Sequence, residues 1–288
     1  MKRALITGAA GFLGSHVADE LTLRGYDVIL FDIKDSPYKQ SNQKMVTGNI
    51  ADFELLKSAT ENIDCVFHFA GMAGIEECVT NPQGTVQNNI LGTVNLLEAC
   101  RLNKVQRFIF ASSVYVFSDQ GGFYRSSKRA CESYIDDYQK IYGLDYAILR
   151  YGSLYGERCS DGNRLQKILE AFVENGECSL SGKDSDIREY IHVRDAARLT
   201  ADSLDDKFKN ARLTITGLEK YKMADLINII KSITGKEIKI TFDNVEKYQY
   251  ATTPHSYSME ESLKIIANPF IDIGQGITKL LEYLKYGK

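Results

Sequence analysis

The stretch Gly8-Ala9-Ala10-Gly11-Phe12-Leu13-Gly14 has the spacing G-x-x-G-x-x-G. It follows a short apolar run at residues 3–6, and apolar residues then recur at helical spacing as far as Leu21. The stretch is therefore predicted to be the turn between a first strand and a first helix. Glycines in such a turn let backbone N–H groups approach a pyrophosphate at the positive end of a helix. A plain strand-to-helix turn uses the same residues, so the motif needs a second element.

The second element lies at the end of the next apolar run, residues 27–31. Asp32 follows Gly14 by 18 residues. An acidic side chain there accepts hydrogen bonds from the adenosine ribose hydroxyls of a dinucleotide and repels a 2′-phosphate. As a lone residue Asp32 could equally be a strand-end turn residue, but the two features together predict an NAD site. Its first predicted members are Gly8, Gly11, Phe12, Leu13, Gly14 and Asp32.

Further apolar runs at residues 65–69, 108–111 and 146–149 are too continuous for strands with one wet face. Helical patterns at 86–97 and 126–141 lie between them. This alternation predicts βαβ units and a Rossmann-type, doubly wound parallel sheet, hence an α/β fold. After about residue 156, helical patterns at 165–173, 223–233 and 277–284 predict a smaller α+β substrate-binding lobe.

The chain has 288 residues, enough for two such units. The predicted division is a dinucleotide-binding domain at 1–156, with a return segment near 188–216, and a second lobe made of 157–187 and 217–288. Only four prolines occur, and no linker composition separates the units. The two units are therefore expected to share an interface.

Composition excludes several classes of protein. Apolar residues make up 44% and charged residues 25% of the chain, which predicts a globular protein. The net charge of -3 gives no overall positive potential that would attract nucleic acid, so no nucleic-acid partner is predicted. No apolar stretch is long enough for a membrane span, and the N-terminal apolar run stops at Thr7, so no signal peptide is predicted. The six cysteines lack C-x-x-C spacing, which predicts reduced thiols in a cytoplasmic protein and no metal site.

Tyr124 and Lys128 are four residues apart and so share one helix face. A phenol has a pKa near ~10, so a nearby cation is needed for it to act as a base at neutral pH. Ser113 ends the strand before them, where α/β folds carry their chemistry, and its hydroxyl can bind the same substrate oxygen. The alternative is a buried ring, a solvated charge and an ordinary strand-end serine. The combination instead predicts proton transfer coupled to hydride transfer at a carbinol carbon, with Ser113, Tyr124 and Lys128 as catalytic residues.

With these residues, the chain resembles the extended short-chain dehydrogenase/reductases, and among them the NAD-dependent nucleotide-sugar epimerase/dehydratase family. The resemblance covers almost the whole chain. It is carried by residues 7–16, 66–71, 88–93, 111–113, the Tyr124 and Lys128 pair, 149–156 and 188–195.

The resemblance implies further ligand contacts. The cofactor would also meet Asn49, Ile50, Phe69, Ala70, Gly71, Asn89, Ser112, Tyr124, Lys128 and Tyr151. A nucleotide-diphosphate sugar would meet Ser113, Tyr124, Ser153 and Arg188, and the guanidinium of Arg188 would hold the diphosphate. The alternative for Arg188 is a surface ion pair with Asp184 or Asp186. His192, in the same motif, is expected to pack structurally.

Departures from the family pattern narrow the reaction. Similar 4,6-dehydratases and decarboxylases have acidic residues where this chain has Val114 and Tyr115, and neither side chain is a carboxylate acid or base. The loop from Ser113 to Tyr124 is shorter than is usual in the family. No arginine occurs after Arg212, so the second phosphate-binding arginine that the resemblance implies has no counterpart in that part of the sequence. Residues that remain open as its substitute are Lys222, Lys236 and His255.

The first hypothesis is a nucleotide-sugar 4-epimerase that oxidises C4 transiently and returns the hydride to the opposite face. The second is an NAD-dependent 4-ketoreductase or dehydrogenase that uses the same residues and exchanges its cofactor. The third is a non-catalytic NAD-binding protein, against which the intact trio argues. By resemblance a homodimer is expected, with helices at 86–102 and 126–141 forming a four-helix bundle. Neither the base nor the sugar can be deduced from the sequence.

Overall fold

The computed structural model describes residues 2–159, 162–243, 248–256, 258 and 261–287. Its centre is an eight-stranded sheet with the strand order β3-β2-β1-β4-β5-β6-β11-β14, and all neighbouring strands are parallel. The order reverses direction between β1 and β4, as in the Rossmann arrangement. The predicted fold class is therefore confirmed. The strands are β1 (Arg3–Thr7), β2 (Asp27–Asp32), β3 (Lys44–Thr47), β4 (Cys65–His68), β5 (Arg107–Ser113), β6 (Asp145–Tyr151), β11 (Ala211–Ile215) and β14 (Leu263–Ile265).

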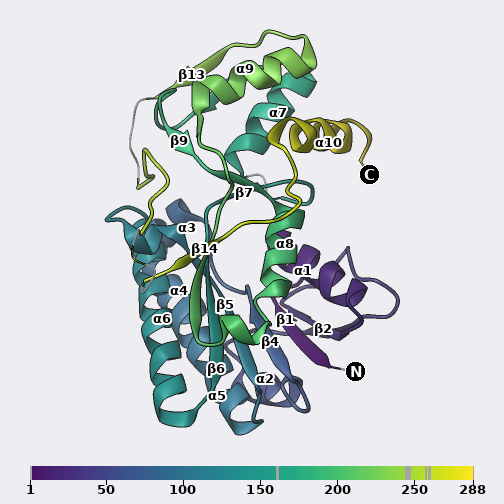
Figure 1. The fold of residues 1–288 in the computed structure, drawn as a ribbon, viewed down its shortest axis with the longest axis vertical. Helices are drawn as coiled ribbons and strands as arrows, with labels where there is room; N and C mark the ends of the chain where they lie inside the picture. Colours follow the sequence, from purple (N-terminus) through teal and green to yellow (C-terminus); the bar gives the residue numbers. More distant parts are fainter. Residues whose placement is uncertain (1, 160–161, 244–247, 257, 259–260, 288) are drawn as a thin grey trace.

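Helices cover both faces of this sheet (Figure 1). On one face α1 (Phe12–Leu23) and α8 (Val193–Asp202) pack against the strands. On the other face lie α2 (Phe53–Ala59), α5 (Gly92–Leu102) and α6 (Gly122–Tyr142). The central strands β1, β4, β5 and β6 are buried along almost all of their length because neither face of the sheet meets water there. The two resulting cores hold the carboxyl ends of the strands in fixed positions.

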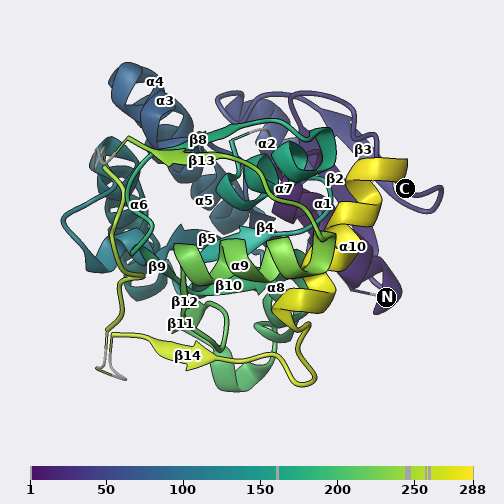
Figure 2. The same ribbon diagram turned by 90° about the horizontal axis from the view of Figure 1, so that it is seen from above.

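A smaller unit lies beyond those carboxyl ends, at the top of Figure 1 and nearest the viewer in Figure 2. Its core joins three helices, α7 (Arg164–Glu174), α9 (Met223–Thr234) and α10 (Ile273–Tyr286). Three short strand pairs accompany them. They are β8 (Cys178–Leu180) with β13 (Ile240–Phe242), β9 (Ile187–Arg188) with β12 (Tyr221–Lys222), and β7 (Ser153–Tyr155) with β10 (Tyr190–His192).

Two local features differ from simple periodicity. The helical pattern at 86–97 is not one regular helix. A short α4 (Pro82–Thr85) leads into a π-helical stretch, η1 (Val86–Leu91), which continues as α5. Wide π turns often occur at functional sites, and Asn89 lies in this one. The second feature is β14, which comes from the 217–288 segment but pairs with β11 as the outermost strand of the large sheet.

Remaining connections are short. A 3-10 turn, η2 (Val114–Phe117), follows β5, α3 (Ile75–Thr80) follows β4, and a second 3-10 turn, η3 (Asp206–Phe208), precedes β11. None of the six cysteines forms a disulfide. Within the described ranges, no helix combines the length and apolar character needed to cross a membrane.

Candidate active site and cofactor cradle

The glycine turn packs as tightly as the motif predicted. Gly8 has a φ of +71°, and a Cβ there would lie 2.6 Å from the backbone nitrogen of Ala70. A Cβ on Gly14 would lie 2.2 Å from the carbonyl oxygen of Gly8. Backbone therefore touches backbone where α1 meets the turn, and no larger residue fits without movement.

The beginning of α1 presents its amides without competition from side chains. Gly11 is the N-cap and offers no capping side chain, and the first turn carries no acidic residue. Phe12 and Leu13 begin a helix of 12 residues, so the positive end of this helix lies at the glycine turn. Amides without a capping side chain at a positive helix end are suited to binding a pyrophosphate, so the glycine turn at residues 8–14 would hold the phosphates of NAD.

Asp32 has a structural task besides the predicted one. Its Oδ2 accepts a hydrogen bond of 2.9 Å from the backbone N–H of Ala10, which ties the end of β2 to the glycine turn. Among the described residues this is the only hydrogen bond of the Asp32 carboxylate, so Oδ1 stays available for a ribose hydroxyl. The predicted role in NAD binding stays a prediction that fits this geometry.

The predicted adenine contacts, Asn49 and Ile50, follow the end of β3. Asn49 is exposed, and its Oδ1 accepts a hydrogen bond of 2.9 Å from the N–H of Ala51. Ile50 is buried, and its side chain fills the space beside Gly92, where a Cβ would come within 2.5 Å of it. Among the described residues, the Asn49 side chain therefore stabilises the local turn that contains it.

The segment after β4 is held by Asn89. Its Oδ1 accepts from the N–H of Met72 at 2.7 Å, and its Nδ2 donates to the Met72 carbonyl at 3.0 Å and to Ser127 Oγ at 3.0 Å. Phe69 and Ala70 are half-buried and Gly71, with a φ of +143°, is exposed. The buried Asn89 thus braces the predicted cofactor-lining segment against α6.

The structure brings the three residues predicted to be catalytic together at the carboxyl end of β5. The hydroxyl of Ser113 lies close enough to the phenol of Tyr124 to favour its ionised form. The Lys128 ammonium is buried, lies 5.8 Å from the centre of the Tyr124 ring, and donates a hydrogen bond of 2.7 Å to the carbonyl of Ala111. Side chains that are 11 and 15 positions from Ser113 in the sequence therefore form one cluster.

Burial dominates the acidity of this cluster. It raises the pKa of Tyr124 to about 12, and the hydroxyl of Ser113 acts in the opposite direction. Burial also lowers the pKa of Lys128. In this arrangement the Ser113 hydroxyl is the group that lowers the pKa of Tyr124 and so favours its phenolate. The Lys128 ammonium instead donates its hydrogen bond to the backbone carbonyl of Ala111.

Aromatic rings enclose the phenol. The ring of Tyr115 meets that of Tyr124 edge-on at 6.2 Å and lies 4.6 Å from the ring of Tyr250. The Tyr115 hydroxyl donates to Gln249 Oε1 at 2.6 Å, and burial raises its pKa well above the usual value. At the position where related dehydratases carry an acid, this chain therefore has a neutral phenol.

The predicted substrate residues converge on Tyr250, which sequence reasoning missed. Its hydroxyl shares a hydrogen bond of 3.2 Å with Ser153, and the guanidinium of Arg188 lies 4.4 Å from its ring centre. Arg188 does pair with Asp186, as the alternative had it, with Nη2 3.7 Å from Oδ2, but both side chains are buried and the pair is not on the surface. No regular spacing links residue 250 to the trio, and only the tertiary fold reveals it.

The hydroxyls of Ser112 and Tyr151, two predicted cofactor contacts, form hydrogen bonds with other side chains of the protein. Ser112 donates to Glu132 Oε1 at 2.5 Å, and the buried Tyr151 shares a hydrogen bond of 2.6 Å with Thr200. His68, which the sequence reading did not assign, is also buried, and its two ring nitrogens lie 2.7 and 2.9 Å from the hydroxyls of Thr7 and Thr93. Burial lowers its pKa to about 3, so the ring is neutral.

Behind the trio lies a buried ion pair that the sequence did not indicate. Glu132 lies about two helical turns after Tyr124 on α6. Its Oε1 accepts a hydrogen bond of 3.1 Å from Arg150 Nε, and its Oε2 accepts one of 2.6 Å from Arg150 Nη2. Arg150 Nη1 also donates to the carbonyl of Glu261 at 2.6 Å. The pair links α6 to β6 and borders an open groove of about 820 Å³.

The three candidates for a second phosphate-binding residue lie in other surroundings. Lys236 donates to the carbonyl of Phe172 at 2.9 Å, and His255 Nε2 lies 2.7 Å from Glu189 Oε1. Lys222 is exposed on β12. His192 is buried beside Tyr155, with ring centres 5.1 Å apart, as expected for a packing residue.

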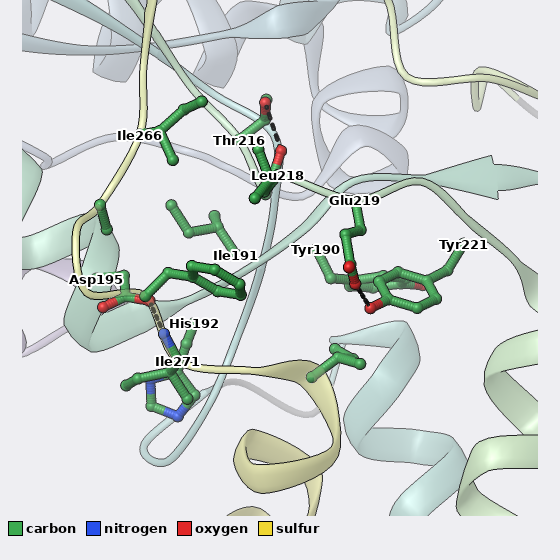
Figure 3. Close-up of a pocket in the computed structure, with 14 residues that line it drawn as sticks. Tyr190, Ile191, His192, Asp195, Thr216, Leu218, Glu219, Tyr221, Ile266 and Ile271 are labelled. Carbon is green, nitrogen blue, oxygen red and sulfur yellow. Dashed lines mark hydrogen bonds between the residues drawn. The ribbon is translucent and has the colours of Figure 1, made fainter.

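A small pocket of about 30 Å³ is drawn in Figure 3. Its walls come from β10, from the segment after β11 and from the segment before α10, and they include none of the catalytic trio. The N–H of Ile271 donates to Asp195 Oδ2 at 2.6 Å on one side of it. A space of this size is suited to about one water molecule, so it is no sugar site.

Gly14→Ala is expected to weaken NAD binding by roughly 10- to 100-fold, the effect of inserting a methyl group where the backbone leaves no room. The reason is the 2.2 Å approach to the Gly8 carbonyl. Titration of NAD into the stripped protein measures it. Gly176→Ala is the control, since a Cβ there meets nothing within 4 Å. Equal NAD affinity in the two variants would contradict the close-contact explanation.

Comparison with known proteins agrees with this geometry. The chain is 28% identical to a putative UDP-glucose 4-epimerase of Methanocaldococcus jannaschii, with 98% of each chain covered. It is 26% identical to the UDP-glucuronate 4-epimerase of Thermodesulfobacterium geofontis, over 98% of this chain and 95% of the relative. A solved UDP-glucuronic acid 4-epimerase from Bacillus cereus, in complex with UDP-glucuronic acid and NAD, has the same fold, with a TM-score of 0.87 at 24% identity over 99% of this chain and 100% of that chain.

The sequence profile of one family covers most of the chain. Residues 4–212 match that of the NAD dependent epimerase/dehydratase family. The match includes the glycine turn, the trio and Arg188, which are the residues on which the resemblance was based. The chain therefore belongs to the NAD dependent epimerase/dehydratase family, and its cofactor is NAD.

Proposed function

We propose that this NAD-dependent enzyme is a UDP-sugar 4-epimerase. The observation that carries the proposal is the clustering of Ser113, Tyr124 and Lys128, with the phenol of Tyr115 against the Tyr124 ring at the position where related dehydratases carry an acid. Such a site can remove and return a proton at a sugar hydroxyl, but it offers no acid or base for dehydration. The names of the similar proteins from M. jannaschii and T. geofontis support a UDP-sugar.

In the proposed reaction, the Tyr124 phenolate accepts the proton of the C4 hydroxyl as a hydride leaves C4, which yields a 4-keto sugar. Ser113 donates a hydrogen bond to the C4 oxygen throughout. When bound, NAD would supply the acceptor and the donor of the hydride at C4. The keto sugar turns over between the two transfers, and Tyr124 then returns its proton to the C4 oxygen. Lys128, at the base of the cluster, would hold the nicotinamide ribose, and the glycine turn and Asp32 would hold the rest of the cofactor.

The decisive experiment supplies no nicotinamide. The purified protein is incubated with UDP-, GDP-, dTDP- and CDP-hexoses, including UDP-glucose and UDP-glucuronic acid, and proton NMR follows the configuration at C4. A C4 epimer is the expected product. Turnover only after NAD or NADH is added would identify the 4-ketoreductase or dehydrogenase instead. NAD binding without any turnover would identify a non-catalytic NAD-binding protein.

The pH dependence tests the acid-base assignment. Because burial raises the pKa of Tyr124, kcat/KM is expected to rise with pH through the neutral range as the phenolate fraction grows. Ser113→Ala removes the hydroxyl that lowers this pKa, so the rising limb is expected to move to higher pH. Ser126→Ala, whose hydroxyl donates to the Gly122 carbonyl on the same helix, is the control. A pH profile of Ser113→Ala that coincides with that of the wild type would contradict the assignment.

We further propose the division into a cofactor domain (1–156, with the return segment 188–216) and a nucleotide-sugar lobe (157–187 and 217–288). The separate cores of the two units support it. The position of β14 in the large sheet adds one strand from the second segment to the first unit.

A homodimer through the helices at 86–102 and 126–141 completes the proposal. Large apolar side chains are exposed on them, with Ile141 68% and Tyr134 45% exposed. Replacing both by aspartate is expected to give a monomer in sedimentation velocity, because charges would enter an apolar helix-helix interface. The control is Leu23→Asp on α1, where the side chain is 83% exposed. A wild-type chain that sediments as a monomer would refute the dimer.

A further inference from the structure

Arg164, at the start of α7, and Arg188, at the end of β9, share one carboxylate, that of Asp186. Arg164 Nη1 lies 3.2 Å from Asp186 Oδ2, and Arg188 Nη2 lies 3.7 Å from the same oxygen. The N–H of Lys183 also donates to Oδ2, at 3.3 Å. Asp186 is only 4% exposed. This cluster, here called the arginine pair, places two guanidinium groups side by side around a single anionic atom.

Arg164 has unused donors. Its Nε and Nη2 are buried and have no hydrogen-bond partner within the described ranges. Leaving such donors unpaired away from water is costly, and a guanidinium presents them in a fork that matches a phosphate. Arg188 makes both its hydrogen bonds in the described chain through Nη1, to the carbonyls of Ile187 and Ala251.

The charge of the arginine pair is unbalanced. Among the described residues, the two guanidinium groups form ion pairs with one carboxylate, that of Asp186, so one positive charge remains in a mostly buried place. The phenol of the neighbouring Tyr190 does not balance it, because burial raises its pKa to about 12. An anion with several oxygens would satisfy both the charge and the unused donors.

The helix amides offer no alternative anion site. Arg164 is the first residue of α7, but the Asn163 side chain already accepts from the N–H groups of Leu165 and Gln166, at 3.1 and 3.2 Å. A phosphate near this end of the lobe would therefore be bound by the Arg164 side chain and not by the helix terminus.

The arginine pair also lies at a suitable place relative to the chemistry. Arg188 stacks on Tyr250, whose ring contacts that of Tyr115, and the latter meets Tyr124. A substrate with its sugar at Tyr124 would therefore direct the group beyond the sugar toward Arg188. In a nucleotide sugar that group is the diphosphate.

We propose that Arg164 is the second diphosphate-binding arginine of this chain and acts with Arg188 around Asp186. The inference rests on the proposed function, because it takes a nucleotide-diphosphate sugar as the substrate. It also replaces Lys222, Lys236 and His255 as candidates for this role. In this chain the role of the second phosphate-binding arginine is thus assigned to Arg164, which precedes Arg188 by 24 positions.

Binding, without turnover, tests the proposal. UDP, UMP and uridine, together with GDP, dTDP and CDP, are titrated calorimetrically into the NAD-loaded protein. Arg164→Gln is expected to weaken binding of the preferred diphosphate by roughly 10- to 100-fold, the effect of losing charge-assisted hydrogen bonds. Binding of the free nucleoside should change less than about threefold, because it lacks the phosphates. Arg164→Lys should fall between, since it keeps the charge but not the fork.

The control is Arg212→Gln. Arg212 is 26% exposed in its side chain, compared with 21% for Arg164, and likewise pairs with one carboxylate, that of Asp136. It should leave diphosphate binding unchanged. Equal UDP affinity of Arg164→Gln and the wild type would overturn the proposal, as would an equal loss for UDP and uridine, which would indicate damage to the fold. A wild-type protein that binds a diphosphate tightly but epimerises no sugar would refute the proposed reaction and leave the arginine pair standing.

Discussion

Tyr124→Phe is expected to lower kcat of C4 epimerisation by roughly 10²- to 10⁴-fold, the range that a positioned general acid-base group contributes. The phenylalanine ring keeps the edge-on contact with Tyr115 and leaves the glycine turn untouched. NAD binding should therefore stay within about twofold of the wild type. Epimerisation followed by proton NMR and NAD retention after gel filtration measure the two quantities separately.

Tyr138→Phe is the matched control for this prediction. Tyr138 lies on the same helix, and its hydroxyl also makes a hydrogen bond, to Glu98 at 3.1 Å. Its removal should leave kcat unchanged. If Tyr124→Phe kept full activity, Tyr124 would not be the base and the proposed reaction would be wrong. If it lost NAD as well, its role would be structural.

Glu132→Ala is expected to destabilise the folded protein by about 3–5 kcal/mol, because it leaves the buried Arg150 charge without its partner. Ser112 loses its acceptor in the same change. Urea unfolding followed by circular dichroism measures the loss, with NAD at the same concentration in every sample, because a bound ligand adds to apparent stability.

Two comparison variants test whether the loss of stability in Glu132→Ala comes from the burial of the Arg150 charge and not simply from the loss of an ion pair. Glu98 pairs with Arg101 three residues later on an exposed helix face, with 32% of its side chain exposed, and Glu98→Ala should cost less than about 1 kcal/mol. Glu132→Ala with Arg150→Met removes both charges, so the double variant should be more stable than Glu132→Ala alone. A loss for Glu132→Ala no larger than that for Glu98→Ala would show that Arg150 finds water or another partner.

Local pattern was sufficient to place the glycine turn, Asp32 and the helix face that Tyr124 and Lys128 share, while their roles toward NAD and substrate stay predictions. The glycine turn is a contiguous stretch, Asp32 ends the next strand, and Tyr124 and Lys128 are separated by one helical turn. Their placement follows from the geometry of a single βαβ unit or a single helix. The continuous apolar runs likewise predicted a parallel sheet covered on both faces, because only a strand buried on both sides excludes polar residues.

Periodicity was a weaker guide where elements are short or irregular. The strand β14 has only three residues and lies at the sheet edge, so nothing in its composition marked it as part of the large sheet. The π-helical turn at Val86–Leu91 has apolar residues at helical spacing, and its altered hydrogen bonding left no sign in the sequence. Both features concern pairing with neighbours, which a single segment does not encode.

The sequence by itself determined the fold class, the position of the glycine turn and the residues predicted as the catalytic trio, because each depends on residues that are neighbours along the chain. Only the tertiary structure decided that Tyr250 lies between Ser153 and Arg188, that Glu132 is paired with Arg150, and that Arg164 reaches Asp186. These contacts join segments between 18 and 97 positions apart, and their distances are set by how the lobes and helices pack. Side-chain packing of that kind follows no spacing rule, so the partners became visible only in the folded chain.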